Sequence, residues 1–415
     1  MKQGWEIKKL GDVCDFCNGL WTGKNPPFQT VGVIRNTNFT KDCLLDDTDI
    51  VYLEVEQSQF KKRKLQFGDI ILEKSGGGPK QPVGRVVVFD KKEGDFSFSN
   101  FTSVIRIKNS KQLDFEFLHK FLFHEYLSGA TEKMQSHSTG IRNLKFDEYK
   151  EIEIPLPTLP EQHRIVSILD QCFSAIDKAK ANAEQNLKNT KELFESYLQG
   201  VFENGKEDWE VKKLKEVFEI KPQKKEAKEK LAEVDLVTFL PMEDLGIMEK
   251  EVQPVQTRTL KEVIGSYTYF AENDVLLAKI TPCFENGKIG IAKKLINGIG
   301  FGSSEYIVFR SNGNIEADFL FYFLSRESFR KEGRKHMSGA VGHKRVSKDW
   351  IENYLIPFPK SKADQHLIIS QLDALCEKTE TLIAVYRKKI ADLEELRKSV
   401  LQKAFCGELT KKEQL

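Results

Sequence analysis

Two segments in each half of the chain carry side chains that could contact an anionic ligand such as nucleic acid. The first segment follows a short apolar run. Its candidate residues are Lys74, Ser75 and Lys80 in the N-terminal half, and Lys279, Thr281, Asn286 and Lys288 in the C-terminal half. Ammonium, hydroxyl and amide groups can donate to phosphate oxygens or base edges. Glycines at 76–78 would permit close approach of the backbone.

The second segment lies further along each half and has a similar composition. Its candidates are Ser138, Thr139, Arg142 and Asn143 in the N-terminal half, and Ser338, His343, Lys344 and Arg345 in the C-terminal half. Arginine, lysine and asparagine are the side chains that most often contact phosphates and base edges. The alternative is that these are solvated surface loops, which vary faster than cores.

One tetrapeptide suggests catalysis. Asn25-Pro26-Pro27-Phe28 matches the motif by which amino-methyltransferases hold a target amino group. That chemistry needs an S-adenosylmethionine site built on a glycine-rich turn between a strand and a helix. The best glycine cluster, Gly298–Gly302, leads into a strand-like run instead. We therefore expect a proline-stiffened loop, with a self-contained adenine DNA methyltransferase as the alternative.

Metal and nucleotide motifs are weak. The glycine run at 76–78 lacks the spacing of a P-loop, which favours a mobile loop and leaves DNA contact as the alternative. Cys14 and Cys17 form a single pair without a second pair or spaced histidines. We expect no metal site and no catalytic residues in this chain.

The candidate segments belong to a unit that occurs twice. Trp5–Leu10 returns as Trp209–Leu214, and Gly68–Leu72 returns as Asn273–Leu277. Ile154-Pro-Leu-Pro157 returns as Ile356-Pro-Phe-Pro359. The offset stays between 202 and 205 residues along the whole chain. This constancy indicates a tandem duplication.

Each copy begins with a region in which short β-rich runs alternate with helical stretches. The first copy predicts strands within 83–89 and 103–107 and a helix over 115–127. The second predicts strands within 274–280 and 305–310 and a helix over 319–329. The expected fold class is α+β, a tandem duplication of a mixed α/β domain.

Each copy ends in a long helix. Thr158–Glu161 and Ser361–Asp364 both have the spacing of a capping box at a helix start. Apolar residues then recur at intervals of three and four, which is the coiled-coil pattern. The seam residues are Ile165, Leu169, Ile176, Leu187 and Phe194 in the first helix, and Ile368, Leu372, Leu375, Leu382, Ile390 and Leu393 in the second. We expect the helices to pair as an antiparallel coiled coil, and packing of each on its own domain is the alternative.

These boundaries divide the chain into four parts: a globular domain at 1–157, a helix at 158–205, a second domain at 206–359 and a second helix at 360–415. The 415 residues have a net charge of +2, and each globular domain has +1. This excludes a strongly basic nucleic-acid coat, but not DNA binding, because charge can be segregated by face. Any DNA affinity of the chain alone should be modest and salt-sensitive.

Composition also bears on location. A membrane span needs about 18 apolar residues in a row, and the sequence has no such run. The first ten residues lack the apolar core of a signal peptide. The seven cysteines are an odd number and are expected to be reduced. The expected location is cytoplasmic.

The ordered set of motifs resembles the DNA-specificity subunits of type I restriction–modification systems. The resemblance rests on Trp-Glu-x-Lys-Lys-Leu, Gly-Asp-Ile-Ile-Leu, Ile-Pro-Leu-Pro with Glu-Gln-His-Arg-Ile, and Leu-Gln-x-x-Phe at the helix ends. It covers nearly the whole chain. It implies that each globular part is a target-recognition domain that reads one half of a bipartite, asymmetric site in double-stranded DNA.

The resemblance also implies partners. The helices would set the spacing of the half-sites and dock two modification (methyltransferase) subunits, which carry S-adenosylmethionine. Restriction subunits would carry the nuclease and the translocase, with ATP and Mg. The chain itself would be non-catalytic. A third possibility is a coiled-coil dimeriser that does not bind DNA.

Overall fold

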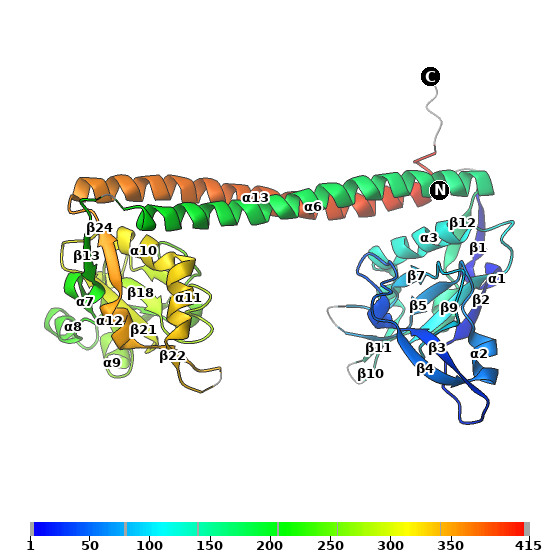
Figure 1. The fold of residues 1–415 in the computed structure, drawn as a ribbon, viewed down its shortest axis with the longest axis horizontal. Coiled ribbons are helices and arrows are strands. Elements are labelled where there is room, and N and C mark those ends of the chain that lie inside the picture. The colour runs from blue at the N-terminus through cyan, green and yellow to red at the C-terminus, as the bar shows by residue number, and fades with distance from the viewer. Residues whose placement is uncertain are drawn as a thin grey trace, which may run out of the picture. The chain divides into compact units, whose positions relative to one another are not determined.

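The computed structural model describes residues 4–78, 81–138, 141–205, 207–254, 256–340 and 342–410. The chain forms two compact units. Unit 1 comprises residues 1–183 and 388–415, and unit 2 comprises residues 184–387. Each unit therefore contains one globular domain, the start of the helix that follows this domain and the end of the other long helix (Figure 1).

The globular part of unit 1 is built on an antiparallel sheet of β2 (Cys14–Asn18), β9 (Thr102–Ile107), β5 (Ile70–Glu73) and β7 (Val86–Val88), in that order. Helix α3 (Phe115–Leu127) packs against this sheet. The other strands are β4 (Val51–Glu56), β3 (Phe28–Ile34) and β8 (Phe96–Phe98) in one sheet, β10 (Gln135–Ser138), β11 (Ile141–Leu144) and β6 (Ser75–Gly77) in another, and β1 (Glu6–Lys9) with β12 (Glu153–Leu156). The short helices are α1 (Leu10–Val13), α2 (Gln57–Arg63), α4 (Ala130–Lys133) and α5 (Phe146–Lys150).

Unit 2 repeats the central sheet with β14 (Phe218–Ile220), β21 (Tyr306–Ser311), β18 (Val275–Ala278) and β19 (Ile289–Ile291). A second four-stranded sheet contains β16 (Gln256–Thr259), β15 (Leu236–Leu240), β20 (Ile299–Gly302) and β17 (Thr268–Ala271). Two pairs complete the strands: β13 (Glu210–Lys213) with β24 (Leu355–Phe358), and β22 (Met337–Ser338) with β23 (Arg345–Val346). The helices are α7 (Leu214–Val217), α8 (Lys225–Lys230), α9 (Leu260–Val263), α10 (Ala317–Ser325), α11 (Glu327–Lys335) and α12 (Lys348–Asn353).

Most predicted elements occur where expected, and the helix over 115–127 is confirmed with its bounds. The helix predicted over 319–329 is wrong in one respect, because it is two helices that meet at Arg326. The backbone of Arg326 is extended (φ −60°, ψ 140°). Its Nε donates to the carbonyl of Phe323 (2.8 Å), and its guanidinium lies 3.9 Å from the centre of that ring. The buried arginine therefore occupies the position at which the first helix ends.

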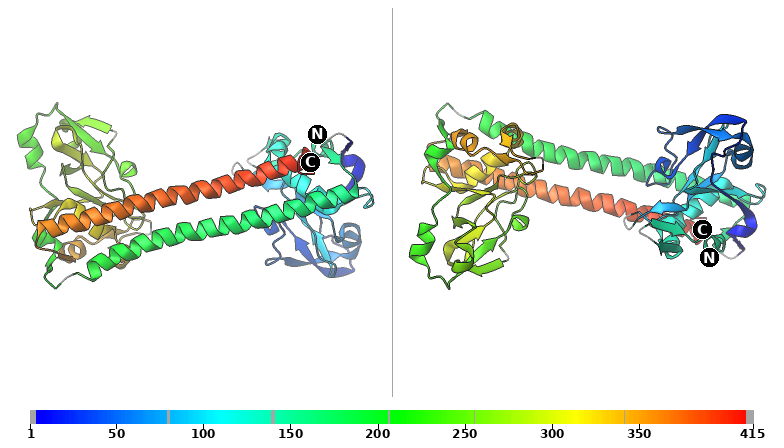
Figure 2. Two further views of the ribbon diagram at one scale, coloured as in Figure 1. Left: turned by 90° about the horizontal axis from the view of Figure 1, so that it is seen from above. Right: turned by 90° about the horizontal axis from the view of Figure 1, so that it is seen from below.

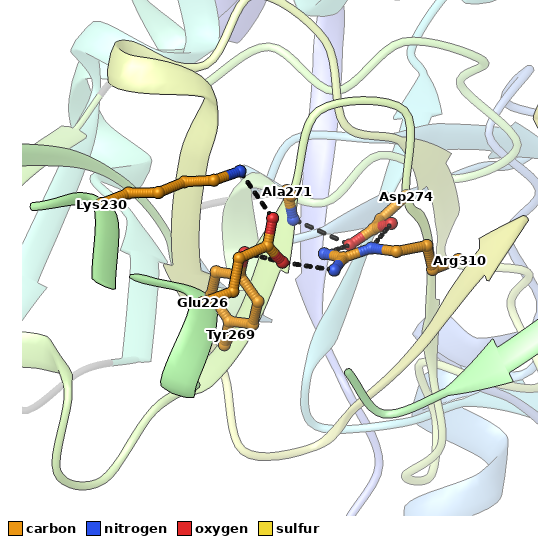
Figure 3. Close-up of polar contacts among 6 residues, drawn as sticks. All are labelled: Glu226, Lys230, Tyr269, Ala271, Asp274 and Arg310. Carbon is orange, nitrogen blue, oxygen red and sulfur yellow. Dashed lines mark hydrogen bonds and ion pairs between the residues drawn. The ribbon is translucent and has the colours of Figure 1, made fainter. Parts of the chain in front are cut away.

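The repeated Asp-Ile/Val motif has a structural role in both units. Asp69 accepts two hydrogen bonds from Arg106 (2.7 and 2.6 Å) and one from the backbone N–H of Gln66 (2.7 Å). In unit 2, Asp274 binds Arg310 in the same way (2.9 and 2.7 Å; Figure 3). Both aspartates are buried, so these bidentate pairs join the two middle strands of each central sheet.

Unit 2 extends this pair into a network. Glu226 of α8 accepts hydrogen bonds from Lys230 (2.7 Å), Tyr269 (2.7 Å) and Arg310 (2.5 Å), as Figure 3 shows. These bonds, that from Lys230 foremost, lower the pKa of Glu226 from 4.5 to about 2. The charged carboxylate thus joins α8 to the sheet.

A buried glutamine joins each long helix to its own globular domain. Gln162 in α6 (Leu159–Glu203) donates to the carbonyls of Gln112 (2.9 Å) and Pro157 (2.8 Å) and accepts from the N–H of Asp114 (2.9 Å). Gln365 in α13 (Lys362–Phe405) makes the same three kinds of bond, with the carbonyls of Asn314 and Pro359 and the N–H of Glu316, at 2.9 Å each. The glutamine of the duplicated Gln-His dipeptide therefore has a structural role, because it joins the long helix to its domain.

In unit 1 the start of α6 lies antiparallel to the end of α13. The paired residues are Glu161 with Thr410 (2.7 Å), Asp177 with Arg397, and Lys180 with Glu394 (2.8 Å). In unit 2 the end of α6 and the start of α13 share an apolar cluster that contains Leu198, Phe202 and Leu372. The two segments of each unit lie side by side in both views of Figure 2. The predicted antiparallel pairing of the helices is thus confirmed.

The predicted seam residues are buried or half-buried, with the exception of Leu382. Ile165, Leu169, Ile176 and Leu372 are buried, and Leu187, Phe194, Ile368, Leu375, Ile390 and Leu393 are half-buried. Leu382 is 45% exposed. Both Leu382 and Ile383 fit between Thr379 and Tyr386, at intervals of three and four or of four and three, and the half-buried residue is Ile383. A choice between adjacent apolar residues is not resolved by spacing alone.

The ends of the two helices are anchored by equivalent phenylalanines. Phe405, at the end of α13, contacts Phe117 and Phe121 of α3, with ring centres 5.4 and 5.3 Å apart. Phe202, near the end of α6, contacts Phe319 and Phe323 of α10 at 5.2 and 5.3 Å. Each globular domain thus packs on the end of the helix that follows the other copy, which explains the repeated Leu-Gln-x-x-Phe motif. Among the described residues, no helix is long and apolar enough to cross a membrane.

Candidate nucleic-acid interface

In unit 1 the two predicted segments form one sheet. Strand β6 pairs with β11, so Ser75 lies opposite Asn143. The N–H of Leu144 donates to the carbonyl of Lys74 (2.8 Å), and the hydroxyl of Ser75 donates to Oδ1 of Asn143 (2.5 Å). Segments almost 70 residues apart thus present their polar side chains together. Ser75–Gly77 is a strand, so the preference for a mobile loop at the glycine run is wrong at Gly76 and Gly77.

The same pairing occurs in unit 2. The N–H of Val346 donates to the carbonyl of Lys279 (2.9 Å), which is the counterpart of the bond between Leu144 and Lys74. Ile280 lies opposite Arg345, and the N–H of Thr281 donates to the carbonyl of Lys344 (2.9 Å). Both copies therefore use one backbone framework to bring their two candidate segments together.

The framework is shared, but the side chains on it differ. In unit 1, Nζ of Lys74 donates to Oδ1 of Asn18 (2.8 Å), and burial lowers the pKa of Lys74. Nη1 of Arg142 pairs with Glu132 (3.1 Å). The carbonyl of Phe101 accepts from the N–H of Lys74 (3.0 Å), and the Phe101 side chain is 45% exposed. Phe101 is a candidate contact residue that its isolated position in the sequence did not reveal.

In unit 2 the residue that takes the place of Phe101 is Glu305, whose carbonyl accepts from the N–H of Lys279 (2.9 Å). The carboxylate of Glu305 binds Arg345 through two hydrogen bonds (2.9 and 2.7 Å). Nζ of Lys279 donates to the carbonyl of Ser304 (2.9 Å), and burial lowers the pKa of Lys279. The equivalent positions thus hold an exposed aromatic ring in one unit and an ion pair in the other.

Some predicted residues lie elsewhere. Nζ of Lys288 donates to the carbonyls of Met242 (2.7 Å) and Glu243 (3.3 Å), so its ammonium group holds a loop. Asn286 lies in the turn before Lys288, where its N–H donates to the carbonyl of Pro282 (2.9 Å). Two other predicted residues stay beside Arg345: Ser338 pairs with it across β22 and β23, and the carbonyl of His343 accepts a hydrogen bond from it. Lys80, Thr139 and the side chain of Ser138 lie outside the described residues.

A cavity of about 440 Å³ adjoins the paired segments of unit 2. Its wall includes four lysines and three tyrosines: Lys221, Lys224, Lys279, Lys348, Tyr267, Tyr269 and Tyr306. Nζ of Lys224 donates to the carbonyls of Ile264 and Gly265, at 2.9 Å each, and burial lowers the pKa of Lys224. The sequence pattern did not single out Lys221 and Lys224, because they belong to a mixed charge run that also suits a solvated helix, nor Lys348, which is an isolated lysine.

The tetrapeptide at Asn25–Phe28 has a structural setting. The N–H of Asn25 donates to Glu56 (3.2 Å), and Phe28 begins strand β3. The glycines at 300 and 302 lie in β20, where an added Cβ would come within 2.1 Å of the Phe270 ring and 2.3 Å of the Leu240 carbonyl oxygen. These glycines therefore permit close packing within a sheet, and they do not form the turn that a methyl-donor site requires.

The cysteine pair is divided between two cores. Cys14 and Cys17 lie on one strand at an odd spacing, so their side chains point to opposite faces. Burial raises the pKa of the Cys14 thiol to about 12, which makes it a poor metal ligand. All seven cysteines are free thiols. Within the described ranges, no group of three or more His, Cys, Asp or Glu side chains could hold a metal ion.

Comparison with known proteins agrees with the duplicated architecture. The putative type I restriction enzyme MjaX specificity subunit of Methanocaldococcus jannaschii is 23% identical over 424 residues, which cover 98% of this chain and 94% of the relative. The type I restriction enzyme EcoAI specificity subunit of Escherichia coli is 34% identical over 210 residues. That match covers 50% of this chain and 35% of the relative, so it spans about a third of that relative's length.

Two solved structures share the fold. The HsdS subunit from Thermoanaerobacter tengcongensis is 20% identical, with a TM-score of 0.61 and 98% of each chain covered. A chain from a study of complex assembly and conformational transition in the type I R-M system is 19% identical, with a TM-score of 0.76 and coverage of 98% of this chain and 99% of that chain.

The sequence model of one family matches the chain twice, at residues 2–188 and 206–391. These two matches coincide with the two copies of the internal repeat and together include most of the chain. The family is described as the type I restriction modification DNA specificity domain. The chain therefore belongs to the family of type I restriction–modification DNA specificity domains, two of which it carries in tandem.

Proposed function

We propose that this chain is the non-catalytic specificity subunit of a type I restriction–modification complex, in which each globular domain reads one half of a bipartite, asymmetric DNA site. The observation that carries the proposal is the pairing of the candidate segments. Both units use the same backbone hydrogen bond, from Leu144 to Lys74 and from Val346 to Lys279. The side chains on that framework differ. Two readers of different half-sites need such an arrangement.

The helices would set the distance between the half-sites. Helices α6 and α13 have 45 and 44 residues, which corresponds to about 66 Å at 1.5 Å per residue. Half-sites on one face of DNA lie about 34–36 Å apart. Helices of this length can span that distance and leave surface for two methyltransferase subunits. Those subunits would carry S-adenosylmethionine, and restriction subunits would carry ATP, Mg and the nuclease.

Partner subunits would also supply much of the electrostatic attraction. Each globular domain has a net charge of only +1. Several candidate cations already bind protein groups, such as Arg142 with Glu132 and Lys279 with the Ser304 carbonyl. The chain alone should bind DNA modestly and release it as salt increases. Tight sequence-specific binding by the chain alone at physiological salt would contradict this part of the proposal.

The central test is a genome-wide map of N6-methyladenine in strains with and without this gene. The proposal expects one bipartite methylated motif that disappears with the gene, and a map without any gene-dependent motif would overturn it. Incubation of the pure chain with labelled S-adenosylmethionine and DNA tests the methyltransferase alternative. Methyl transfer without a partner would favour that alternative.

The dimeriser alternative is tested by variants in each unit. Under the proposal, Arg142→Ala weakens recognition of one half-site and Lys344→Ala weakens recognition of the other. A protein that only dimerises would show the same methylation pattern in both variants as in the wild type. The paired variants are matched because both residues follow a glycine by two positions in equivalent segments.

A further inference from the structure

We propose that Arg345 reads a guanine in the half-site contacted by unit 2, and that Glu305 positions its guanidinium group for this contact. The inference rests on the proposed function and adds the chemistry of one base. Some N–H groups of Arg345 donate to protein acceptors, and others have no partner among the described residues.

Glu305 occupies one edge of the guanidinium. Nε of Arg345 donates to Oε2 of Glu305 (2.9 Å), and Nη2 donates to Oε1 (2.7 Å). This is a side-on bidentate pair, which fixes the plane of the group. One N–H of Nη1 donates to the carbonyl of His343 (3.2 Å). The hydrogen bonds from Arg345 also lower the pKa of Glu305, so the carboxylate is charged at neutral pH.

The other edge remains available. One N–H of Nη1 and one of Nη2 have no partner among the described residues. The guanine contact that we propose uses the edge between Nη1 and Nη2, and it requires that the bond to His343 takes the N–H of Nη1 on the Cδ side. The Arg345 side chain is 46% exposed, whereas that of Glu305 is 21% exposed. The carboxylate is therefore the more buried partner, and the free donors belong to the more exposed one, Arg345.

A pair of parallel N–H donors selects guanine among the bases. In the major groove, guanine presents two adjacent acceptors, O6 and N7. Adenine presents an acceptor beside a donor, and that donor would oppose an arginine N–H. Cytosine presents a donor, and thymine presents a single acceptor with a methyl group. Prior fixing of the arginine by Glu305 reduces the rotamer entropy that binding must remove.

Unit 1 has different chemistry at the same place. The counterpart of Arg345 is Asn143, which lies opposite Ser75 and whose Oδ1 accepts a hydrogen bond from the Ser75 hydroxyl (2.5 Å). The counterpart of Glu305 is the exposed Phe101. The two units therefore present different chemical groups at this position, which accords with an asymmetric site.

The first experiment maps methylated motifs in cells that carry the full complex with Arg345→Ala. We expect one guanine of one half-site to become degenerate, with discrimination lowered roughly 10-fold or more, as for loss of a bidentate base contact. The other half-site should stay unchanged. The matched control is Asn143→Ala, whose changes should be confined to the other half-site.

The second experiment measures binding of the purified complex to DNA in which each guanine of the half-site is replaced in turn by 7-deazaguanine. This base lacks the N7 acceptor. Wild type should lose affinity at one position, and Arg345→Ala should show no further loss there. Inosine, which keeps O6 and N7, should be tolerated at that position, and this excludes a minor-groove contact.

Glu305 is tested as a positioning residue. Glu305→Ala should lower affinity while guanine stays the preferred base, and Glu305→Gln, which retains one acceptor for Arg345, should restore part of the affinity. Thermal melts show whether each variant is folded. If the complex methylates a bipartite motif and Arg345→Ala leaves that motif intact, the guanine assignment is overturned while the proposed function stands. If no gene-dependent motif exists, the proposed function itself fails.

Discussion

At the scale of single residues, buried carboxylates organise both domains. Asp69 and Asp274 each bind an arginine through two hydrogen bonds, and both follow equivalent turns before a central strand. Glu73 adds a second buried pair in unit 1. It binds Arg85 at 2.8 and 2.9 Å directly before the candidate residues Lys74 and Ser75. These ion pairs hold the strands from which the candidate contacts project.

The pair of Arg85 and Glu73 yields a stability prediction. Both side chains are buried, at 7% and 2% exposure, so Arg85→Met would leave an uncompensated charge. We expect a loss of about 3–5 kcal/mol in the free energy of unfolding of unit 1. Hydrogen exchange of strand β5 measures this loss locally. The double variant Arg85→Met/Glu73→Leu should recover most of the stability, and equal instability of both variants would contradict the charge argument.

The network around Glu226 gives a pH prediction. The folded pKa of Glu226 is about 2 and the ordinary value is 4.5. The unfolded chain therefore binds the extra proton between these values, and stability falls as pH falls through this range. Glu226→Gln should lower the free energy of unfolding by about 1–2 kcal/mol above pH 5, since the side chain is partly exposed, and by little near pH 2. Urea unfolding of both proteins across this range measures the difference, and a pH-independent difference would contradict the prediction.

At the scale of elements, the helices and the globular domains depend on each other. Each domain packs against the start of its own helix through a buried glutamine, Gln162 or Gln365. It also packs against the end of the other helix through a phenylalanine, Phe405 or Phe202. The helices are therefore part of the core of each domain. A single domain that is truncated at the start of its helix would lose these core contacts.

The two phenylalanines form a matched pair of tests. Phe405→Ala should destabilise unit 1 by about 3–5 kcal/mol because it leaves a cavity against Phe117 and Phe121. Phe202→Ala should destabilise unit 2 by a similar amount. Hydrogen exchange of α3 and α10 distinguishes the units. Each variant should affect mainly its own unit, and a uniform loss across both would show that the two units unfold together.

At the scale of the whole molecule, the proposed function predicts that the helix length determines the gap in the DNA site. One heptad inserted in each helix, after Ala183 and before Lys388, keeps the antiparallel register and adds about 10 Å, or about three base pairs. Three heptads add about 31 Å, which is close to one turn of DNA and returns the half-site to nearly the same face.

The methylated motif of such variants should have a correspondingly longer gap. The control is a heptad in one helix only, which makes the two helices unequal in length. The pairing in unit 1, such as Lys180 with Glu394, and the pairing in unit 2 then cannot both be kept, and methylation should be abolished. An unchanged gap in the three-heptad variant would contradict the spacer role.

The sequence by itself determined the duplication, the two long helices and the family. These features depend on local patterns, such as heptad spacing and capping residues, or on the order of motifs. Local patterns and motif order can both be identified from the sequence alone. It also located the candidate segments in each copy. It did not resolve Leu382 from Ile383, nor the break at Arg326, because neighbouring apolar or helical residues look alike in a pattern.

Only the tertiary structure decided how the candidate residues meet. The pairing of Ser75 with Asn143 and of Ile280 with Arg345 joins segments that are far apart in sequence. Glu305 binds Arg345, and Lys288 binds the carbonyl groups of a loop. Both contacts depend on the path of the backbone, which local spacing in the sequence does not predict. The orientation of each candidate side chain is set by such non-local contacts, and for this reason the spacing of residues along the chain did not predict it.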